Sequence, residues 1–222
     1  RRGYKYKKLK VNGIKTEVFK PKKNASENVI FVCHGGAYVS RMMFYYRLLN
    51  KRYSKASGGG TVIHFDYRCA PEYTHPAMID DCLTIWNWML DQGYKAENTI
   101  VVGDSSGGNM ALQLILRLHD AGKPMPRGAV LYSPWSDMTA SGDSYVYNYK
   151  VDPVFGVRGY TPTKEECQKL LYKSELYNWL GDTPRDDRYV SPALTYYDDT
   201  YPPIFVTVGG DEVLKSECEL LV

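Results

Sequence analysis

Short, unbroken apolar segments alternate with longer amphipathic segments along most of this sequence. The apolar segments are rich in β-branched and aromatic residues, which is typical of strands buried on both faces of a parallel sheet. These expected strands cover residues 29–33, 61–65, 99–102, 129–132 and 204–208. Helices are expected over residues 44–56, 76–90 and 106–121, and the last of them is apolar nearly all round. Strands and helices in this order predict a doubly wound α/β fold.

The first residues follow a different pattern. Lysines alternate with Tyr and Leu over residues 4–11, and Asn12-Gly13 separates them from a second strand-like run at residues 14–19. An Asn-Gly pair between two such runs predicts a β-hairpin. We interpret the lysines as protection of an edge strand against sticking to its neighbours, in preference to a phosphate-binding patch.

A second departure covers residues 141–192, which are polar and aromatic and show no strand pattern. One helix is expected there. It begins at Thr163, where Glu166 completes a capping box, and it ends near Leu180. An insertion of this length between two sheet strands predicts a lid or a substrate-facing cap. We therefore expect one α/β domain over residues 1–222, with residues 141–192 as its cap.

The composition limits the function further. With 222 residues, of which 44% are hydrophobic and 24% charged, the chain resembles one large globular domain and not a disordered or disulfide-stapled protein. Its 28 Lys and Arg against 25 Asp and Glu give a net charge of +3, too small to indicate a nucleic-acid or membrane partner. The five cysteines are scattered, with no Cys-x-x-Cys spacing. We expect buried free thiols, no metal site and a cytoplasmic location.

The candidate nucleophile is Ser105, in the sequence Gly103-Asp104-Ser105-Ser106-Gly107-Gly108. This Gly-x-Ser-x-Gly pattern follows an apolar strand and opens the apolar helix, which is the context of a nucleophile elbow. The glycines remove Cβ atoms that would collide at such a turn, and the helix N-terminus favours a developing oxyanion. A phosphate-binding loop would need Gly-Lys-Ser/Thr, which this segment lacks.

A second motif, His34-Gly35-Gly36-Ala37, follows the strand at residues 29–33. Adjacent glycines let a backbone approach a substrate closely, and acyl transfer needs N–H donors about 3 Å from the oxyanion. We expect these donors to be the N–H groups of Gly35, Gly36 and Ser106. His34 is expected to orient this loop and not to act as the catalytic base.

Five motifs together resemble those of the hormone-sensitive-lipase-like esterases, in the same order and spacing. They are His34-Gly-Gly-Ala, Tyr67-Arg-Cys-Ala-Pro-Glu72, His75-Pro-Ala-Met-Ile-Asp-Asp81, the elbow around Ser105, and Ser133-Pro-Trp-Ser-Asp137. The resemblance implies an α/β-hydrolase fold with a mostly parallel sheet, helices on both faces, and hydrolysis of carboxylic esters with mostly short acyl chains. It also implies supporting roles at the site, for His34, Asp104, Glu72 and Gly107. Ala37 and Ser106 replace a glycine and an alanine of the family pattern, and both still supply backbone N–H groups.

The resemblance implies the acid of a catalytic triad as well. The family places this carboxylate after the strand at residues 204–208, and alignment from Pro202-Pro203 puts it at Glu212, with Asp211 as the close alternative. The order Ser, acid, His then requires a histidine after residue 222. The four histidines of the sequence are poorly placed for this role, namely His34, His64, His75 and His119. We therefore expect a chain truncated at both ends, without the last strand and helix of the family.

The leading hypothesis is a serine carboxylesterase that acts on a small-molecule ester through an acyl-enzyme at Ser105, with no metal or organic cofactor. The alternative is a non-catalytic ligand-binding protein on the same fold, because plant gibberellin receptors resemble this family but lack the catalytic histidine. A peptide or protein amidase would share the same residues. We expect neither nucleic acid nor membrane as a partner. A homo-oligomer stays open, because several family members pair through the last strand.

Overall fold

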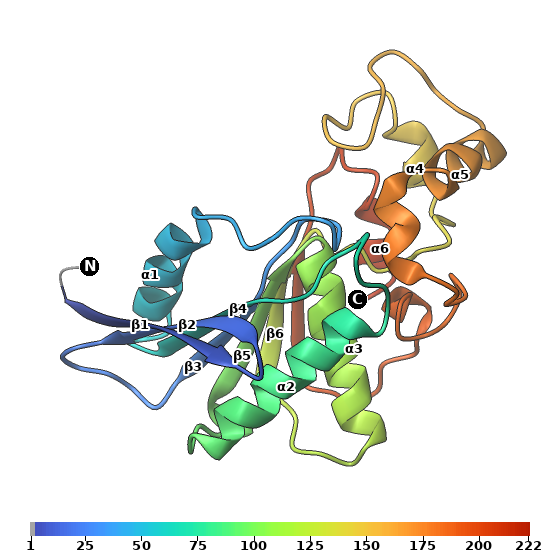
Figure 1. Ribbon diagram of the computed structural model, residues 1–222. Helices are drawn as coiled ribbons and strands as arrows, with labels where there is room; N and C mark the ends of the chain where they lie inside the picture. The colour runs from blue at the N-terminus through green and yellow to red at the C-terminus, as the bar shows by residue number, and fades with distance from the viewer. Residues whose placement is uncertain (1–2) are drawn as a thin grey trace.

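A seven-stranded, mostly parallel sheet forms the centre of the computed structural model, which describes residues 3–222 (Figure 1). The strand order is β1-β2-β4-β3-β5-β6-β7, and the strands from β4 to β7 in this order run parallel. β2 pairs antiparallel with both β1 and β4. The bounds are Tyr4–Val11 (β1), Ile14–Pro21 (β2), Val29–Cys33 (β3), Thr61–Asp66 (β4), Thr99–Asp104 (β5), Gly128–Tyr132 (β6) and Ile204–Thr207 (β7).

The predicted hairpin is present at the start of the sheet. Val11 pairs with Ile14, and Asn12-Gly13 forms the turn between them. Asn12 has a φ of 48° and Gly13 a φ of 86°. Both lie in the left-handed region that a two-residue hairpin turn of this kind requires, which explains the Asn-Gly pair.

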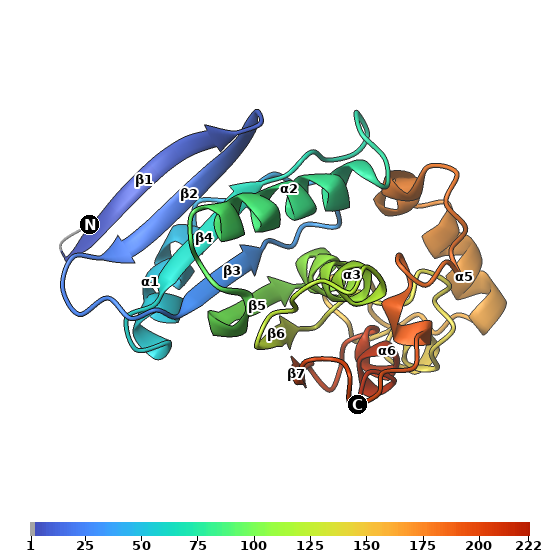
Figure 2. The same cartoon turned by 90° about the horizontal axis from the view of Figure 1, so that it is seen from below.

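Helices cover both faces of the sheet (Figure 2). α2 (Ala77–Asp91) and α3 (Ser106–Asp120) lie on one face, and α1 (Tyr46–Ala56) lies on the other. Neighbouring side chains of β3 alternate between the two layers, because Phe31 packs in the larger core with α2 and α3 while Ile30 packs in the smaller core with α1. The doubly wound prediction is confirmed. The remaining short helices of the domain are η1 (Ala96–Asn98) and α6 (Lys215–Glu219).

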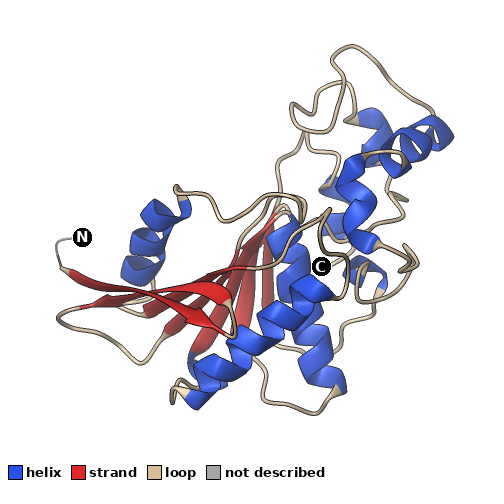
Figure 3. Cartoon of the chain, in the orientation of Figure 1, coloured by secondary structure: helices blue, strands red, loops and turns tan. Residues whose placement is uncertain are grey.

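Residues 141–192 form loops and short helices outside the sheet, and none of these described residues is in a strand (Figure 3). The capping box is confirmed, since Thr163 Oγ1 accepts from the Glu166 N–H and the Glu166 carboxylate accepts from the Thr163 N–H. The predicted helix end near Leu180 is wrong. The helix ends at Tyr172, because the Ser174 hydroxyl caps a separate 3-10 helix. The elements are α4 (Ser144–Tyr147), α5 (Lys164–Tyr172), η2 (Glu175–Leu180) and η3 (Pro192–Leu194).

The cysteines and the lengths of the helices complete the description of the fold. All five cysteines are buried and unpaired, as predicted. Within residues 3–222, no helix combines the length and the apolar character needed to cross a bilayer.

Candidate active site

Ser105 lies in a sharp turn between β5 and α3. Its backbone has φ 53° and ψ −123°, a conformation that residues other than glycine rarely adopt. The Ser105 N–H donates to the Tyr132 carbonyl at 2.9 Å, and the Ser105 carbonyl accepts from the Trp135 N–H at 3.1 Å. These bonds to the segment after β6 hold the turn in its strained form, which is the geometry of a nucleophile elbow.

The glycines on either side of Ser105 are required by close backbone contacts. A Cβ atom at Gly103 would lie 2.2 Å from the Gly107 carbonyl oxygen. A Cβ atom at Gly107 would lie 2.2 Å from the Cys33 carbonyl oxygen, at the end of β3. Gly107 therefore brings the start of α3 against the loop that follows β3, so the two motifs expected to form the site lie together.

The loop after β3 has three successive residues in the left-handed region. The φ angles are 120° at Gly36, 52° at Ala37 and 61° at Tyr38. The Tyr38 N–H donates to Ser106 Oγ at 3.3 Å, and the Tyr38 hydroxyl donates to Asn109 Oδ1 at 2.8 Å. The side chains of Ser106 and Asn109, both in α3, therefore fix this loop.

The backbone N–H groups around Ser105 differ in their availability. Within residues 3–222, the N–H groups of Gly36, Ala37 and Ser106 donate to no protein acceptor. The Gly35 N–H instead donates to the Tyr46 hydroxyl oxygen at 2.7 Å and lies 3.2 Å from Asp104 Oδ1. Gly35 was expected to be an oxyanion donor, and that expectation is wrong because its N–H is already bound.

The Asp104 carboxylate holds the loop after β3 through hydrogen bonds from Gly35 and Tyr46. It accepts from the Tyr46 hydroxyl at 2.8 and 2.9 Å, which links β5 to α1 and to the loop. A Cβ atom at Gly35 would lie 2.4 Å from Asp104 Oδ2, so a glycine is needed at this position for the carboxylate to approach. Burial raises the pKa of Asp104, and the Tyr46 and Gly35 donors oppose that rise.

His34 is buried beneath the same loop. Its Nδ1 lies 2.8 Å from the Gly35 carbonyl oxygen, and its ring stacks on Tyr67 with 4.0 Å between the ring centres. The Tyr67 hydroxyl donates to the His34 carbonyl at 2.8 Å. Burial lowers the pKa of His34 to about 4, so the ring is neutral near pH 7. These contacts orient the loop and do not reach Ser105.

Of the other three histidines, one is buried in the sheet and two form contacts with other residues. His64 is fully buried within β4. His75 Nδ1 lies 3.0 Å from Thr183 Oγ1, and His119 Nε2 lies 2.9 Å from Thr200 Oγ1. In the part of the chain that the structure describes, no histidine forms a hydrogen bond with Ser105.

The turn after β7 holds one of the two candidate acids in place. Glu212 Oε1 accepts from the Gly209 N–H at 2.8 Å and from the Ser133 hydroxyl at 2.9 Å. Asp211, next to it, is exposed and forms no hydrogen bond or ion pair with any described residue. Ser133 also connects Glu212 to the turn that carries Ser105. It binds Glu212 through its hydroxyl, and the residue before it, Tyr132, accepts from the Ser105 N–H. The geometry therefore favours Glu212 over Asp211.

Three cap residues hold the backbone of this turn, and the sequence analysis did not find them. The Asn148 amide donates to the carbonyls of Gly210, at 3.0 Å, and Glu212, at 2.8 Å. Asp152 Oδ2 accepts from the Val213 N–H at 2.8 Å, and the Ser144 hydroxyl donates to the Val213 carbonyl at 2.5 Å. The only sequence feature that could have indicated these three residues is their regular spacing, since Ser144, Asn148 and Asp152 lie four residues apart.

Two further expectations concern Glu72 and metal binding. Glu72 is exposed and forms no hydrogen bond or ion pair with any residue from 3 to 222. No contact among these residues therefore supports the role expected of Glu72 at the site. Among the same residues, no group of three or more His, Cys, Asp or Glu side chains is arranged to hold a metal ion.

Comparisons with known proteins place the chain in a family. A family model described as alpha/beta hydrolase fold matches residues 30–222. An esterase of Acinetobacter venetianus is 32% identical over 211 residues, which cover 94% of this chain and 64% of the relative. A solved esterase from the bacterial hormone-sensitive lipase family has a TM-score of 0.83 at 29% identity, over 100% of this chain and 70% of that one. A gibberellin receptor of Oryza sativa subsp. japonica is 36% identical over 102 residues, 42% of this chain and 28% of the receptor.

The fold and these matches define an α/β hydrolase, and the chain belongs to the hormone-sensitive-lipase-like family within that class. The chain spans less than two thirds of the length of the Acinetobacter esterase, at 64%.

Proposed function

We propose that the protein is a serine carboxylesterase with Ser105 as its nucleophile. The observation that carries the proposal is the combination of a serine at φ 53° with three nearby backbone N–H groups that have no acceptor among the described residues. These groups belong to Gly36, Ala37 and Ser106, and not to Gly35. Acyl transfer needs this pairing, because a nucleophile must attack while donors receive the negative charge that develops on the carbonyl oxygen.

In the proposed reaction, the Ser105 oxygen attacks the ester carbonyl carbon and gives its proton to a histidine. The carbonyl oxygen becomes an oxyanion that the free N–H groups stabilise, each by about 3 kcal/mol in the barrier. The tetrahedral intermediate then collapses, and the bond to the alcohol oxygen breaks as that oxygen takes the proton from the histidinium. Water attacks the resulting acyl-enzyme and releases the acid, with the same histidine as base.

The histidine is proposed to lie outside this 222-residue sequence. None of the four histidines is bonded to Ser105, and the chain spans only part of its matched relatives. We propose Glu212 as the residue that orients this histidine. The Glu212 carboxylate is already fixed through Oε1 by Gly209 and Ser133, so Oε2 is available for an imidazole N–H.

Small-molecule esters with short acyl chains are the proposed substrates, on the basis of the family resemblance. Cap residues 141–192 are proposed to shape the mouth of the acyl and alcohol sites, because they lie outside the sheet and touch the turn that carries Glu212.

A non-catalytic ligand-binding protein is the second candidate. The supporting observation is that no described histidine is bonded to Ser105, and the rice gibberellin receptor matches part of this chain. In this alternative the same free N–H groups would bind a carboxylate of a small ligand and no acyl-enzyme would form.

The test is hydrolysis of p-nitrophenyl acetate, butyrate, octanoate and palmitate by protein expressed from its complete reading frame. We expect the highest kcat/KM for acetate or butyrate, and a loss of about 10⁶-fold in kcat in Ser105→Ala. Ser26→Ala is the control, because Ser26 Oγ is buried near the first hairpin with no partner among the described residues. Unchanged activity in Ser105→Ala would refute the esterase mechanism. No turnover, together with Ser105 inert to a fluorophosphonate probe and saturable binding of a small carboxylic acid, would favour the second candidate.

A further inference from the structure

Formal charge is strongly segregated along the chain, which the net charge of +3 conceals. Residues 1–55 contain 15 Lys and Arg against 2 Asp and Glu, a net charge of +13. Residues 56–222 contain 13 Lys and Arg against 23 Asp and Glu, a net charge of −10. A charge asymmetry of this kind between two parts of a chain points to an anionic partner for the positive part.

Ten of these 15 Lys and Arg lie in β1, β2 and α1. The β1–β2 hairpin and α1 lie side by side at the end of the sheet away from the cap (Figures 1 and 2). Phe19 of β2 and Tyr46 of α1 belong to one small hydrophobic core, against which Tyr4 and Tyr6 of β1 pack. Since side chains alternate along a strand, Lys8 lies on the same face of β1 as Tyr4 and Tyr6. We call this surface of β1, β2 and α1 the basic face; its cations are Lys8, Lys10, Lys15, Arg47, Lys51 and Arg52.

The basic face is hollowed in two adjoining places. One hollow of about 300 Å³ is lined by the aromatic residues Tyr4, Tyr6 and Phe19 and by the cations Arg47 and Lys51. The other, of about 540 Å³, is lined by the cations Lys8, Lys10, Lys15 and Arg47 and by the carboxylates Glu17 and Asp66. Arg47 lines both hollows, so apolar and cationic surfaces are continuous there.

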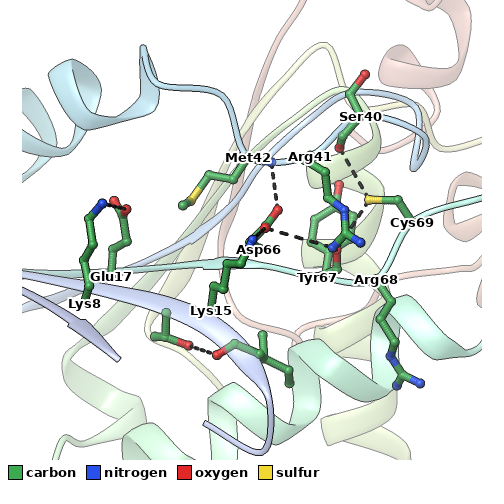
Figure 4. A network of polar contacts seen from close by, with 12 residues as sticks. Lys8, Lys15, Glu17, Ser40, Arg41, Met42, Asp66, Tyr67, Arg68 and Cys69 are labelled. Atoms are coloured by element: carbon green, nitrogen blue, oxygen red, sulfur yellow. Dashed lines mark hydrogen bonds and ion pairs between the residues drawn. The ribbon is translucent and has the colours of Figure 1, made fainter. Parts of the chain in front are cut away.

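The carboxylates of this region lie beneath the surface, while the cations remain exposed. Glu17 and Asp66 have side chains that are only 4% and 8% exposed, whereas Lys8 is 59% and Lys15 71% exposed. Figure 4 shows Lys8 beside Glu17, and Lys15 and Arg41 around Asp66. The outer surface is therefore positive even where ion pairs are present.

Exposed apolar side chains accompany these cations. Phe44 is 77% exposed, Leu48 69% and Met43 42%, and all three lie at or just before the start of α1. α1 contains no acidic residue. Cations interleaved with exposed Phe and Leu are typical of surfaces that lie on anionic bilayers, where the cations attract the headgroups and the apolar side chains enter the interface. A nucleic acid would use the cations but would leave aliphatic side chains such as Leu48 in water.

We propose that the basic face docks the protein on a bilayer surface that contains anionic lipids. The lysines and arginines contact the headgroups, and Phe44 and Leu48 insert among the upper parts of the acyl chains. This docking uses no residue of the proposed catalytic site.

The test is co-sedimentation of the purified full-length protein with vesicles of phosphatidylcholine, alone or with about one third phosphatidylserine. We expect binding only to the vesicles with phosphatidylserine, and loss of binding at about 1 M salt, where the Debye length is about 3 Å. The triple variant Lys10→Glu, Lys51→Glu, Arg52→Glu is expected to bind at least 100-fold more weakly, since each cation near an anionic surface strengthens binding about fivefold. Its matched control is Lys123→Glu, Lys169→Glu, Lys173→Glu, which changes the net charge equally at exposed positions elsewhere.

The apolar contribution is tested separately. Phe44→Ser with Leu48→Ser is expected to weaken vesicle binding about tenfold or more, and the control pair Leu170→Ser with Leu194→Ser is expected to leave it unchanged. Absence of binding by the unaltered protein, or equal binding by the triple variant and its control, would overturn the proposal. Stronger binding to duplex DNA than to vesicles, with no effect of the Phe44 and Leu48 changes, would overturn it in favour of a nucleic-acid surface. Because only binding is measured, failure of the esterase proposal would leave this result intact.

Discussion

The side-chain amide of Asn148 donates to the main-chain carbonyl of Glu212, with 2.8 Å between nitrogen and oxygen. The same amide donates to the Gly210 carbonyl at 3.0 Å, so one residue of the cap binds both sides of the turn that carries the proposed acid. The position of Glu212 therefore depends on the cap as well as on β7, although 64 residues separate Asn148 from Glu212 in the sequence.

Asn148→Ala is expected to loosen this turn and lower kcat about tenfold with little change in KM. Two carbonyls lose their donor, and a part-buried group left without its partner costs about 1–3 kcal/mol. Steady-state kinetics and thermal unfolding provide the measurement. Asn178→Ala is the control, because Asn178 is exposed in η2. Equal losses in the two variants would show that Asn148 has no particular role.

Glu212→Gln and Asp211→Asn are expected to separate the two candidate acids. Glutamine retains an oxygen acceptor for Gly209 and Ser133 but cannot stabilise a protonated histidine, so kcat should fall about 10⁴-fold. Asp211 is exposed and unbonded among the described residues, so Asp211→Asn should stay within about twofold of the unaltered protein. The kcat values of the two purified variants decide between them, and the reverse ranking would assign the acid to Asp211.

Tyr46→Phe is expected to weaken the support of the loop after β3, which carries two of the proposed oxyanion donors. The change removes the hydroxyl that accepts from the Gly35 N–H and donates to the Asp104 carboxylate. Loss of a donor to a largely buried carboxylate should lower the free energy of unfolding by about 2 kcal/mol, measured by urea denaturation. Tyr196→Phe, at an 86% exposed tyrosine, should be neutral. A stability unchanged by Tyr46→Phe would mean that the Gly35 contact to Asp104 is sufficient by itself.

Glu217→Gln is expected to stabilise the protein increasingly as the pH rises. Burial raises the pKa of Glu217 well above its ordinary value. The folded state then keeps a proton that the unfolded chain releases, so the free energy of unfolding of the unaltered protein falls as the pH rises above the ordinary carboxyl pKa. Glutamine avoids this loss and can still accept from the Ser136 N–H, which donates to Glu217 at 2.5 Å, and donate to the Tyr145 hydroxyl oxygen.

Urea denaturation of both proteins from about pH 4 to about pH 8 measures this effect. The two stabilities should be similar at the acid end and diverge toward the alkaline end. Glu217→Ala should be less stable at every pH, because it leaves the Ser136 N–H without an acceptor. A constant difference between Glu217→Gln and the unaltered protein would show that Glu217 is ionised in the folded state across this range.

The sheet and its helices could be predicted because burial on both faces gives each strand an unbroken apolar run. The elbow could be predicted because Gly103 and Gly107 mark positions where a Cβ atom would meet backbone. The donor role of Gly35 was predicted wrongly, since its N–H is bound by a hydroxyl from α1 and no local spacing reports that contact. Asn148 was missed for the same reason. Hydrophobic periodicity describes which surfaces are buried and says nothing of which polar side chain reaches a distant carbonyl.

The anchors Ser144, Asn148 and Asp152 have a consequence for redesign. Under the proposed function, a cap exchanged with that of a relative would leave the turn around Glu212 without these contacts unless the new cap supplies equivalent donors and acceptors at these three positions. Changes confined to residues 157–190 leave the anchors in place. Under the proposed function, exchange of residues 144–152 would therefore change substrate range and catalytic rate together.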